Sequence, residues 1–310
     1  MAIKTPDSFL AIGHRYFAAV AAAGSIRAAS RELNVAASAI SRQLLLLEAQ
    51  LGIDLFERHG RQLKLTAAGE ALLAGLRNAN AQYETVMDQL TALRGLKRGK
   101  LRVATVESIS ASLLPALLIA FADAYPGIDV SVTVAGSDAV TELVRQHEAD
   151  LGFTFNPISL EGLAVEFTRD MQLGAIMAPG HPLAKARRLS LGDCLAHPVA
   201  WPSRGLSLRA ILDRALGSRR SVPRMRVECN SLRLMAALAR DGNCIGFQTE
   251  IGVEDDLAAG SLVFVPLVMR KLPLDQFMVV RRSGSKARPV IDAFLAIARQ
   301  HLRDSPAVRK

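Results

Sequence analysis

Small and apolar residues recur at three- and four-residue steps between residues 26 and 51, with one interruption at Asn34 and Val35. This spacing is typical of amphipathic helices. It predicts two short helices, residues 26–33 and 37–51, separated by a tight turn. A pair of this kind forms a helix-turn-helix, in which the second helix can enter the major groove of DNA. The repeating positions are Ile26, Ala29, Leu33, Ala39, Ile40, Leu44, Leu47 and Leu51.

The polar side chains of this helix pair suit DNA recognition. Ser25 precedes the first helix, where a serine hydroxyl can accept an orphan backbone amide as the N-cap. On the second helix, Arg42 can donate two hydrogen bonds to guanine, serines can contact bases or phosphates, and an alanine methyl can touch thymine. Arg42 is therefore the first residue to test for a role in base recognition. The predicted DNA-binding residues of the pair are Ser25, Arg27, Ala37, Ser38, Ser41 and Arg42.

The stretch after the second helix alternates Leu63 and Leu65 with polar residues, behind a glycine. Alternation next to a glycine turn predicts a short β-hairpin, which would form a wing beside the helix pair. Arg58, Arg61 and Lys64 would then place positive charge against phosphates or in a narrow minor groove. The alternative is a solvated surface loop, because clusters of charge are often only surface.

From residue 66 the apolar period changes to a seven-residue repeat, which is held for three heptads. A period of 3.5 residues makes a seam that another helix can bury, so it predicts a coiled coil. The alternative is a helix that lies on its own domain, which would show a broader stripe. Pairing with a second subunit would place two recognition helices on a roughly palindromic operator. The seam residues are Leu72, Leu76, Ala79, Tyr83, Val86, Leu90 and Leu93.

Taken together, these motifs resemble the LysR-type transcriptional regulators. The segments that carry the resemblance are residues 24–33, 38–43, 47–48, 55–58 and 65–70. The chain departs from the family at Ala36 and Ala37, where many members have Thr or Ser followed by Gln or Pro, and at His14, where leucine is usual. The first turn of the second helix therefore lacks polar side chains. The resemblance implies paired linker helices, dimers that associate into tetramers, and an effector domain.

Beyond residue 100 the chain alternates strand and helix patterns, after a break at residues 94–100 that holds two glycines and four cations. The alternation predicts a largely parallel sheet covered by helices on both faces, and a second alternation from residue 172 predicts a second lobe. Expected strands are residues 101–106, 128–134, 150–155, 172–177, 199–201, 224–227, 244–247 and 274–280. Expected helices are residues 111–125, 139–147, 206–216, 232–240 and 286–302.

The predicted architecture has three parts. They are an all-α winged helix-turn-helix domain, a long linker helix that forms a coiled-coil dimer, and a two-lobed α/β effector domain resembling the periplasmic binding proteins. The resemblance implies that the last strand and helix return to the first lobe, so that the chain crosses between lobes near Glu166 and Arg270. The expected boundaries are 1–66 for the DNA-binding domain, 67–94 for the linker helix, 95–100 for the hinge, 101–166 with 271–310 for lobe I, and 167–270 for lobe II.

Two α/β lobes joined in this way enclose a cleft, and small ligands bind outside the carboxyl ends of the strands. Helix N-termini there favour carboxylate, sulfate or phosphate groups, so we expect a small anionic metabolite. The serines could equally be plain helix caps, the arginine a surface residue and the tryptophan a packing residue. The candidate effector-binding residues are Ser108, Ser110, Ser137, Trp201, Ser203, Arg204, Phe247 and Gln248.

Composition narrows the function classes further. A net charge of +9 favours anionic partners but does not separate nucleic acid from other anionic surfaces. The sequence contains no run of about 18 apolar residues, so we expect no membrane span. The three cysteines, Cys194, Cys229 and Cys244, are odd in number and fit a reduced cytoplasm, with a redox-sensing pair as a minor alternative. We expect no metal, cofactor or catalytic residue, because ligand spacings, phosphate loops and a nucleophile elbow are missing.

Three classes of function remain. The leading one is a ligand-responsive transcription factor that binds double-stranded DNA as a homodimer or homotetramer, with RNA polymerase as a candidate partner and no membrane association. The second is an architectural DNA-binding protein whose α/β part only oligomerises. The third is an enzyme or solute-binding protein with an accessory DNA module. Sensitivity of DNA binding to a metabolite separates the first class from the second, and turnover by residues 100–310 would favour the third.

Overall fold

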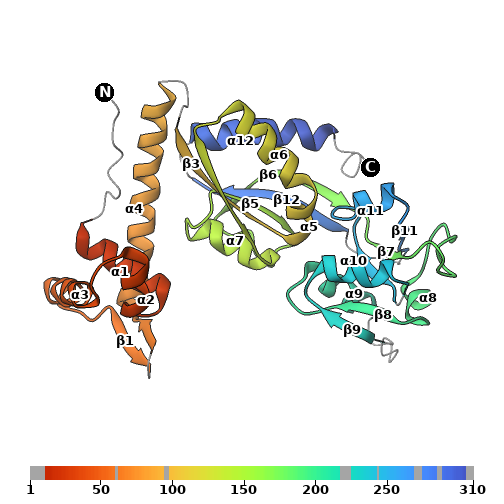
Figure 1. Ribbon diagram of the computed structural model, residues 1–310, viewed down its shortest axis with the longest axis horizontal. Coiled ribbons are helices and arrows are strands. Elements are labelled where there is room, and N and C mark those ends of the chain that lie inside the picture. The colour runs from red at the N-terminus through yellow and green to blue at the C-terminus, as the bar shows by residue number, and fades with distance from the viewer. Residues whose placement is uncertain are drawn as a thin grey trace. The chain divides into compact units, whose positions relative to one another are not determined.

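The computed structural model describes residues 11–59, 62–93, 98–216, 225–242, 244–268, 274–284 and 288–304. Contacts within the chain divide it into two compact units, residues 1–87 and 88–310 (Figure 1). Within the described residues, no helix combines the length and hydrophobicity that crossing a membrane requires.

The first unit is a helical domain with a two-stranded wing. Its elements are α1 (Ile12–Ala23), α2 (Ile26–Leu33), α3 (Ala37–Leu51), β1 (Phe56–His59), β2 (Gln62–Leu65) and the start of α4 (Ala67–Ala92). The helices α2 and α3 have the predicted bounds. The Ser25 hydroxyl accepts the Ala28 amide at 3.2 Å, which confirms the predicted N-cap. Asn34 ends α2 in the left-handed region, with φ of 53°, a conformation that asparagine tolerates.

A small apolar core holds these helices together. Phe17 and Val20 of α1 pack with Ile40 and Leu44 of α3, and each of these side chains is buried. The strands β1 and β2 pair in antiparallel register, with Phe56 opposite Leu65, so the predicted hairpin wing is confirmed. Ala36 stands at the N-cap of α3 without a side-chain hydrogen bond, as the alanine-rich first turn predicts.

The long helix α4 carries the seven-residue repeat. Leu72 and Leu76, at its start, are half-buried against the core of the first unit. The later positions Val86, Leu90 and Leu93 expose 51%, 49% and 85% of their surface. The alternative of a helix packed on its own domain therefore holds for the beginning of α4. The exposed later positions are those that a partner helix could bury, and the coiled coil stays a prediction.

The second unit contains two lobes. Lobe I is built on a five-stranded sheet with the strand order β4-β3-β5-β12-β6. Helices α6 and α12 lie together on one face and α7 covers the other (Figure 1). Buried aromatic rings, among them Phe121, Phe153 and Phe294, fill the layers between sheet and helices. The elements are β3 (Gly99–Thr105), α5 (Glu107–Ala111), α6 (Leu113–Ala124), β4 (Ile128–Val134), α7 (Ser137–Arg145), β5 (Leu151–Phe155), β6 (Leu163–Met171), β12 (Asp275–Arg282) and α12 (Pro289–Asp304).

Lobe II is formed by the chain between β6 and β12. Strands β10, β7 and β11 make one sheet, and β8 pairs with β9 in a second. Trp201 and Phe247 meet edge to face in the lobe II core, with ring centroids 5.5 Å apart. The elements are β7 (Gly174–Met177), α8 (Leu191–Leu195), β8 (Val199–Pro202), α9 (Ser207–Leu216), β9 (Met225–Cys229), α10 (Leu232–Arg240), β10 (Gly246–Gln248), α11 (Glu254–Ala258) and β11 (Val263–Pro266).

The two-lobed α/β architecture agrees with the prediction, but three details differ. Strand β12 runs antiparallel to both β5 and β6, and β7 is antiparallel to both of its neighbours, so the sheets are less parallel than expected. Strand β6 continues through Met171, so the first crossing lies after that residue rather than near Glu166. Strand β3 already begins at Gly99, inside the expected hinge. Residues 94–97 and Arg270 lie outside the described residues.

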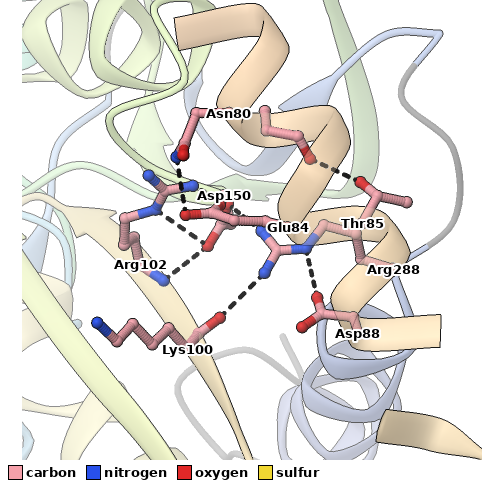
Figure 2. Close-up of polar contacts among 9 residues, drawn as sticks. Asn80, Glu84, Thr85, Asp88, Lys100, Arg102, Asp150 and Arg288 are labelled. Atoms are coloured by element: carbon pink, nitrogen blue, oxygen red, sulfur yellow. Dashed lines mark hydrogen bonds and ion pairs between the residues drawn. The ribbon is translucent and has the colours of Figure 1, made fainter. Parts of the chain in front are cut away.

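A buried ionic cluster fixes the end of α4 to lobe I (Figure 2). Arg288, just before α12, donates from Nε to Asp88 Oδ2 at 2.6 Å, from Nη1 to Asp150 Oδ1 at 2.6 Å and from Nη2 to the Lys100 carbonyl at 3.0 Å. Asp150 also accepts from the Arg102 guanidinium at 2.9 Å. Burial raises the pKa of Asp88, and the Arg288 charge opposes that shift. Two carboxylates and two guanidinium groups therefore neutralise one another where α4 ends.

Candidate functional site

The predicted DNA-facing residues of the helix pair lie on the surface of the first unit. On α3, Ser38 and Arg42 are exposed and Ser41 and Ala37 are half-exposed, while Arg27 is exposed at the start of α2. Ser25 differs from the rest, because its hydroxyl is engaged as the helix cap. The opposite side of α3 is anchored by Ile40, Leu44 and Leu47 in the core.

The predicted wing residues are described unevenly. Lys64 is exposed on β2, and the backbone of Arg58 pairs with Leu63 in the hairpin. Arg61 lies outside the described residues. Glu48, near the end of α3, accepts the backbone amides of Leu55 at 2.8 Å and Phe56 at 3.3 Å. Glu48 therefore sets the start of the wing relative to α3, a positioning role that periodicity alone does not reveal.

A cavity of about 450 Å³ lies between the two lobes. Four predicted residues line it, namely Ser108 and Ser137 from lobe I and Arg204 and Gln248 from lobe II. The volume suits a small metabolite, since ligand cavities typically measure about 300 to 1,000 Å³. Further polar lining comes from Glu107, Ser207, Asn230, Ser231, Thr249 and Asp275.

The other four predicted effector-binding residues do not line this cavity. Trp201 and Phe247 are 2% and 0% exposed in the lobe II core, so the expected stacking surface is wrong. The Ser110 hydroxyl instead donates to the Glu107 carbonyl within α5 at 2.7 Å. Ser203 lies just after β8 and is only half-buried, outside the cavity lining. A residue at a strand end can point into the sheet core as readily as into the cleft, which sequence position does not distinguish.

Glu107 connects the two lobes across the cavity. Its Oε1 accepts from the Ser231 hydroxyl at 2.8 Å and its Oε2 accepts from the Leu232 amide at 2.6 Å. The Glu107 carboxylate of lobe I therefore accepts hydrogen bonds from the N-terminal turn of α10 in lobe II, where a negative charge is favoured. Sequence analysis missed Glu107, although it directly follows a predicted strand in the same way as Ser108.

Asp275 is the second acidic residue that sequence analysis missed. It begins β12 and is only 4% exposed, with one edge in the cavity lining. Burial raises its pKa to about 7, while hydrogen bonds from Ser207 and Asn156 oppose the shift. The sequence did offer one signal, which is an aspartate just before the apolar run of residues 277–280.

The cysteines show no site of their own. All three are buried and none is part of a disulfide, and burial raises the pKa of the Cys194 thiol to about 12, which suppresses the reactive thiolate. Among the described residues, no group of three or more His, Cys, Asp or Glu side chains is placed to hold a metal ion.

Comparison with known proteins matches both units. Residues 14–70 match the family described as bacterial regulatory helix-turn-helix protein, lysR family, and residues 94–303 match the LysR substrate binding domain. The chain is 26% identical to the HTH-type transcriptional regulator CbbR of Rhodospirillum rubrum, over 93% of this chain and 95% of that one. It is 28% identical to the transcriptional activator protein LysR of Escherichia coli K12, over 80% and 79% of the two chains.

Solved structures show the same fold. Full-length OxyR of Pseudomonas aeruginosa superposes with a TM-score of 0.72 at 17% identity, covering 97% of each chain. Full-length CbnR complexed with its target DNA gives a TM-score of 0.61 at 24% identity, covering 93% of this chain and 98% of that one. With its helix-turn-helix and most of its second unit both matched, the chain belongs to the LysR family of transcriptional regulators.

Proposed function

We propose that α3 reads the operator through Arg42, Ser38 and Ser41, with Arg27, Lys64 and the remaining wing cations placed against the DNA backbone. The observation that carries this proposal is the two-sided character of α3, whose apolar side is locked into the core while its polar side is exposed. A rigid helix presents side chains to base edges with little loss of conformational entropy. Through the seam of α4 the chain would pair with a second copy, which implies a roughly palindromic operator.

Replacing Arg42 with alanine tests the base-reading role. A good bidentate contact to guanine contributes about 1 to 3 kcal/mol of discrimination, so the variant should lose about 5- to 150-fold in preference for the operator over unrelated DNA. Footprinting or fluorescence anisotropy at several salt concentrations measures this ratio. Lys64→Ala is the matched control, because loss of a phosphate contact should weaken binding to all sequences equally and reduce the salt dependence by about one unit. Full sequence preference in Arg42→Ala would contradict the proposal.

The cavity between the lobes is proposed as the effector site. Four side chains of the kinds expected converge there from both lobes, and Glu107 already bridges the lobes, so a ligand in the cavity would contact both sides of the same junction. A ligand that favours one lobe arrangement shifts the regulator toward it only by its differential affinity for the two. We propose that a small polar metabolite acts in this way, with Arg204 receiving its anionic group.

Arg204→Ala tests the effector site. The side chain is exposed at the cavity, so its removal should leave the fold intact while a charge-assisted hydrogen bond is lost. We expect about 10-fold or greater loss of affinity for an anion-bearing effector in titration calorimetry, from a contribution of about 1.5 to 3 kcal/mol. Unchanged affinity for a confirmed effector would remove Arg204 from the site.

We propose that the protein acts in the cytoplasm as a regulator rather than as an enzyme, since residues 14–70 match a family described as a bacterial regulatory helix-turn-helix protein. If the protein were instead an architectural DNA-binding protein, no metabolite would change its binding to the operator. Footprinting with and without metabolites distinguishes the architectural protein from the ligand-responsive regulator.

Pairing through α4 would place Val86, Leu90 and Leu93 in a dimer interface. We propose that such dimers can associate into a tetramer, and that RNA polymerase is a further partner. Persistent monomers with intact operator affinity would contradict that pairing.

A further inference from the structure

The carboxyl group of Asp275 occupies an unusual position for an acidic side chain. It lies where lobe I meets lobe II, because its Oδ1 accepts from Asn156 Nδ2 after β5 at 2.8 Å and from the Ser207 hydroxyl at the start of α9 at 3.4 Å. Both donors reach the same oxygen. Within the described part of the chain, Oδ2 receives no hydrogen bond and no cation forms an ion pair with Asp275, although the residue lines the cavity.

Asn156 holds this carboxyl group in place. Its backbone amide donates to the Gln276 carbonyl at 3.1 Å, and its Oδ1 accepts the Gln276 amide at 3.1 Å. Asn156 itself has φ of 37°, in the left-handed region that asparagine adopts more readily than most residues. Asn156 therefore binds both the carboxyl group of Asp275 and the backbone of the next residue, Gln276, which fixes the position of the donor relative to the carboxyl group.

A buried carboxylate with only neutral donors is poorly stabilised. Transfer of a charge out of water is costly unless a cation or several hydrogen bonds compensate it, and here two hydrogen bonds do so only in part. This explains why the pKa of Asp275 rises to about 7. The group therefore titrates much closer to neutral pH than an ordinary aspartate, and an added cation would favour its ionised form.

The other charged groups of the cavity are already accounted for. The Glu107 carboxylate is taken by the Ser231 hydroxyl and the Leu232 amide. Two charges on elements packed against β12 are engaged elsewhere, since Asp170 of β6 accepts from Gln276 and Arg209 of α9 binds Asp213. What the cavity offers a ligand is thus one exposed cation, Arg204, and one buried acid, Asp275.

We propose that the effector is a zwitterion, a small molecule whose ammonium group binds Asp275 Oδ2 while its carboxylate faces Arg204. This inference rests on the proposed effector site and names the chemical class that the site takes. It revises the expectation of a simple anion, because an anion alone leaves Asp275 without a partner. A charged hydrogen bond from an ammonium group would replace the missing cation.

The proposal predicts a pH dependence. An ammonium group binds the ionised carboxylate, so binding lowers the pKa of Asp275 and releases a proton in the fraction of molecules that were protonated. Below about pH 7, where Asp275 is mostly protonated, the apparent affinity should fall by up to about 10-fold per pH unit, because only the ionised fraction is competent. Above that pH the affinity should level off. A ligand that contacts Asp275 only through a hydroxyl group would bind with an affinity that depends less on pH, or that rises as the pH falls.

The test measures thermal unfolding of the full-length protein in the presence of a panel of amino acids. Each amino acid is compared with two analogues, one that lacks the amine and one that lacks the carboxylate. We expect one or more amino acids to stabilise the second unit, and the paired compounds to do so less. Titration calorimetry of that amino acid should show about 30-fold or greater loss of affinity in Asp275→Asn. Asp241→Asn, the same change at an exposed position, is the matched control and should bind as the wild type does.

The remaining outcomes decide against the inference in distinguishable ways. If only compounds without an amine bind, the effector is not a zwitterion, and the proposed effector site stands. If an amino acid binds equally well to Asp275→Asn, or with an affinity that does not fall below pH 7 in the wild type, Asp275 does not receive its ammonium group. If no amino acid binds, the inference is wrong, and the effector site is then judged by the Arg204→Ala variant with whichever effector footprinting identifies.

Discussion

Replacement of Arg288 by methionine is expected to lower the free energy of unfolding of the second unit by about 3 to 5 kcal/mol, which is the cost of leaving buried charges unpaired. Arg288 is 6% exposed and joins Asp88, Asp150 and the Lys100 carbonyl, so its removal leaves the buried Asp88 without its guanidinium partner and Asp150 with Arg102 alone (Figure 2). For a unit of this size, the midpoint of its thermal transition should fall by about 6 to 20 °C. Differential scanning calorimetry measures the change.

Two controls show whether charge is the cause. Arg233→Met, at an exposed position of α10, makes the same chemical change without a buried cluster and should alter stability by less than about 0.5 kcal/mol. Adding Asp88→Asn to Arg288→Met should recover part of the loss, because the carboxylate that lost its guanidinium partner becomes neutral. Equal losses in the single and double variants would show that packing, and not charge, accounts for the effect.

The stability lost in Arg288→Met should depend on pH with a definite sign. Burial raises the pKa of Asp88 in the folded protein above its value in the unfolded chain, so its protonated form favours folding, and that contribution is lost as the pH rises through the folded value. Without Arg288 the pKa of this carboxyl should rise further. The deficit of Arg288→Met should therefore be largest near neutral pH and shrink as the pH falls.

The cluster has a consequence for regulation because Asp88 lies on α4. It is the point at which that helix is fastened to lobe I, through Arg288 and the neighbouring strand β3. A change in lobe I that follows effector binding would reach α4 through this attachment. We expect variants of the cluster to lose part of their response to effector while they keep operator affinity, since no cluster residue lies on the proposed DNA-reading face.

Local periodicity predicted the first unit well because each of its elements is decided by neighbours in sequence. Ser25 caps α2, and Ile40, Leu44 and Leu47 repeat along one side of α3. The topology of the lobes was harder to predict, because β12 joins the sheet of lobe I through strand pairs such as Phe277 with Phe155, which are far apart in the chain. The alternation of strand and helix does not state which strand returns, or in which direction.

The lining of the cavity between the lobes was predicted only in part for a similar reason. Ser108 and Ser137 were found because helix starts after strands are visible in sequence, and such starts face the cleft. Trp201 and Phe247 also stand at strand ends, but each turns into the core. Asp275 and Glu107 were missed because their importance depends on contacts with Asn156 and Leu232, which only the folded chain brings near.

Gly69→Ala is the second change with a large expected effect, and its sign opposes helix propensity. Alanine is favoured over glycine within a helix by about 1 kcal/mol. At Gly69, however, an added Cβ would lie 2.2 Å from the Leu55 carbonyl oxygen and 2.9 Å from Leu65 Cδ2. That carbonyl cannot easily retreat, because it accepts the Thr66 amide at 3.0 Å, while the Thr66 hydroxyl accepts the Gly69 amide and donates to the Asp54 carbonyl.

The expected result is a loss of about 1 to 3 kcal/mol or more in the stability of the first unit, as for other overpacked sites. Because α4 would be pushed away from Leu55 and the wing, operator affinity should fall as well. Gly75→Ala is the matched control on the same helix, since nothing lies within 4 Å of its added Cβ, and it should raise stability by about 0.5 to 1 kcal/mol. Opposite signs for the two alanines, measured by thermal unfolding and operator binding, would show that close approach of α4 to Leu55 positions the DNA-binding unit. Equal signs would show that helix propensity dominates at both positions.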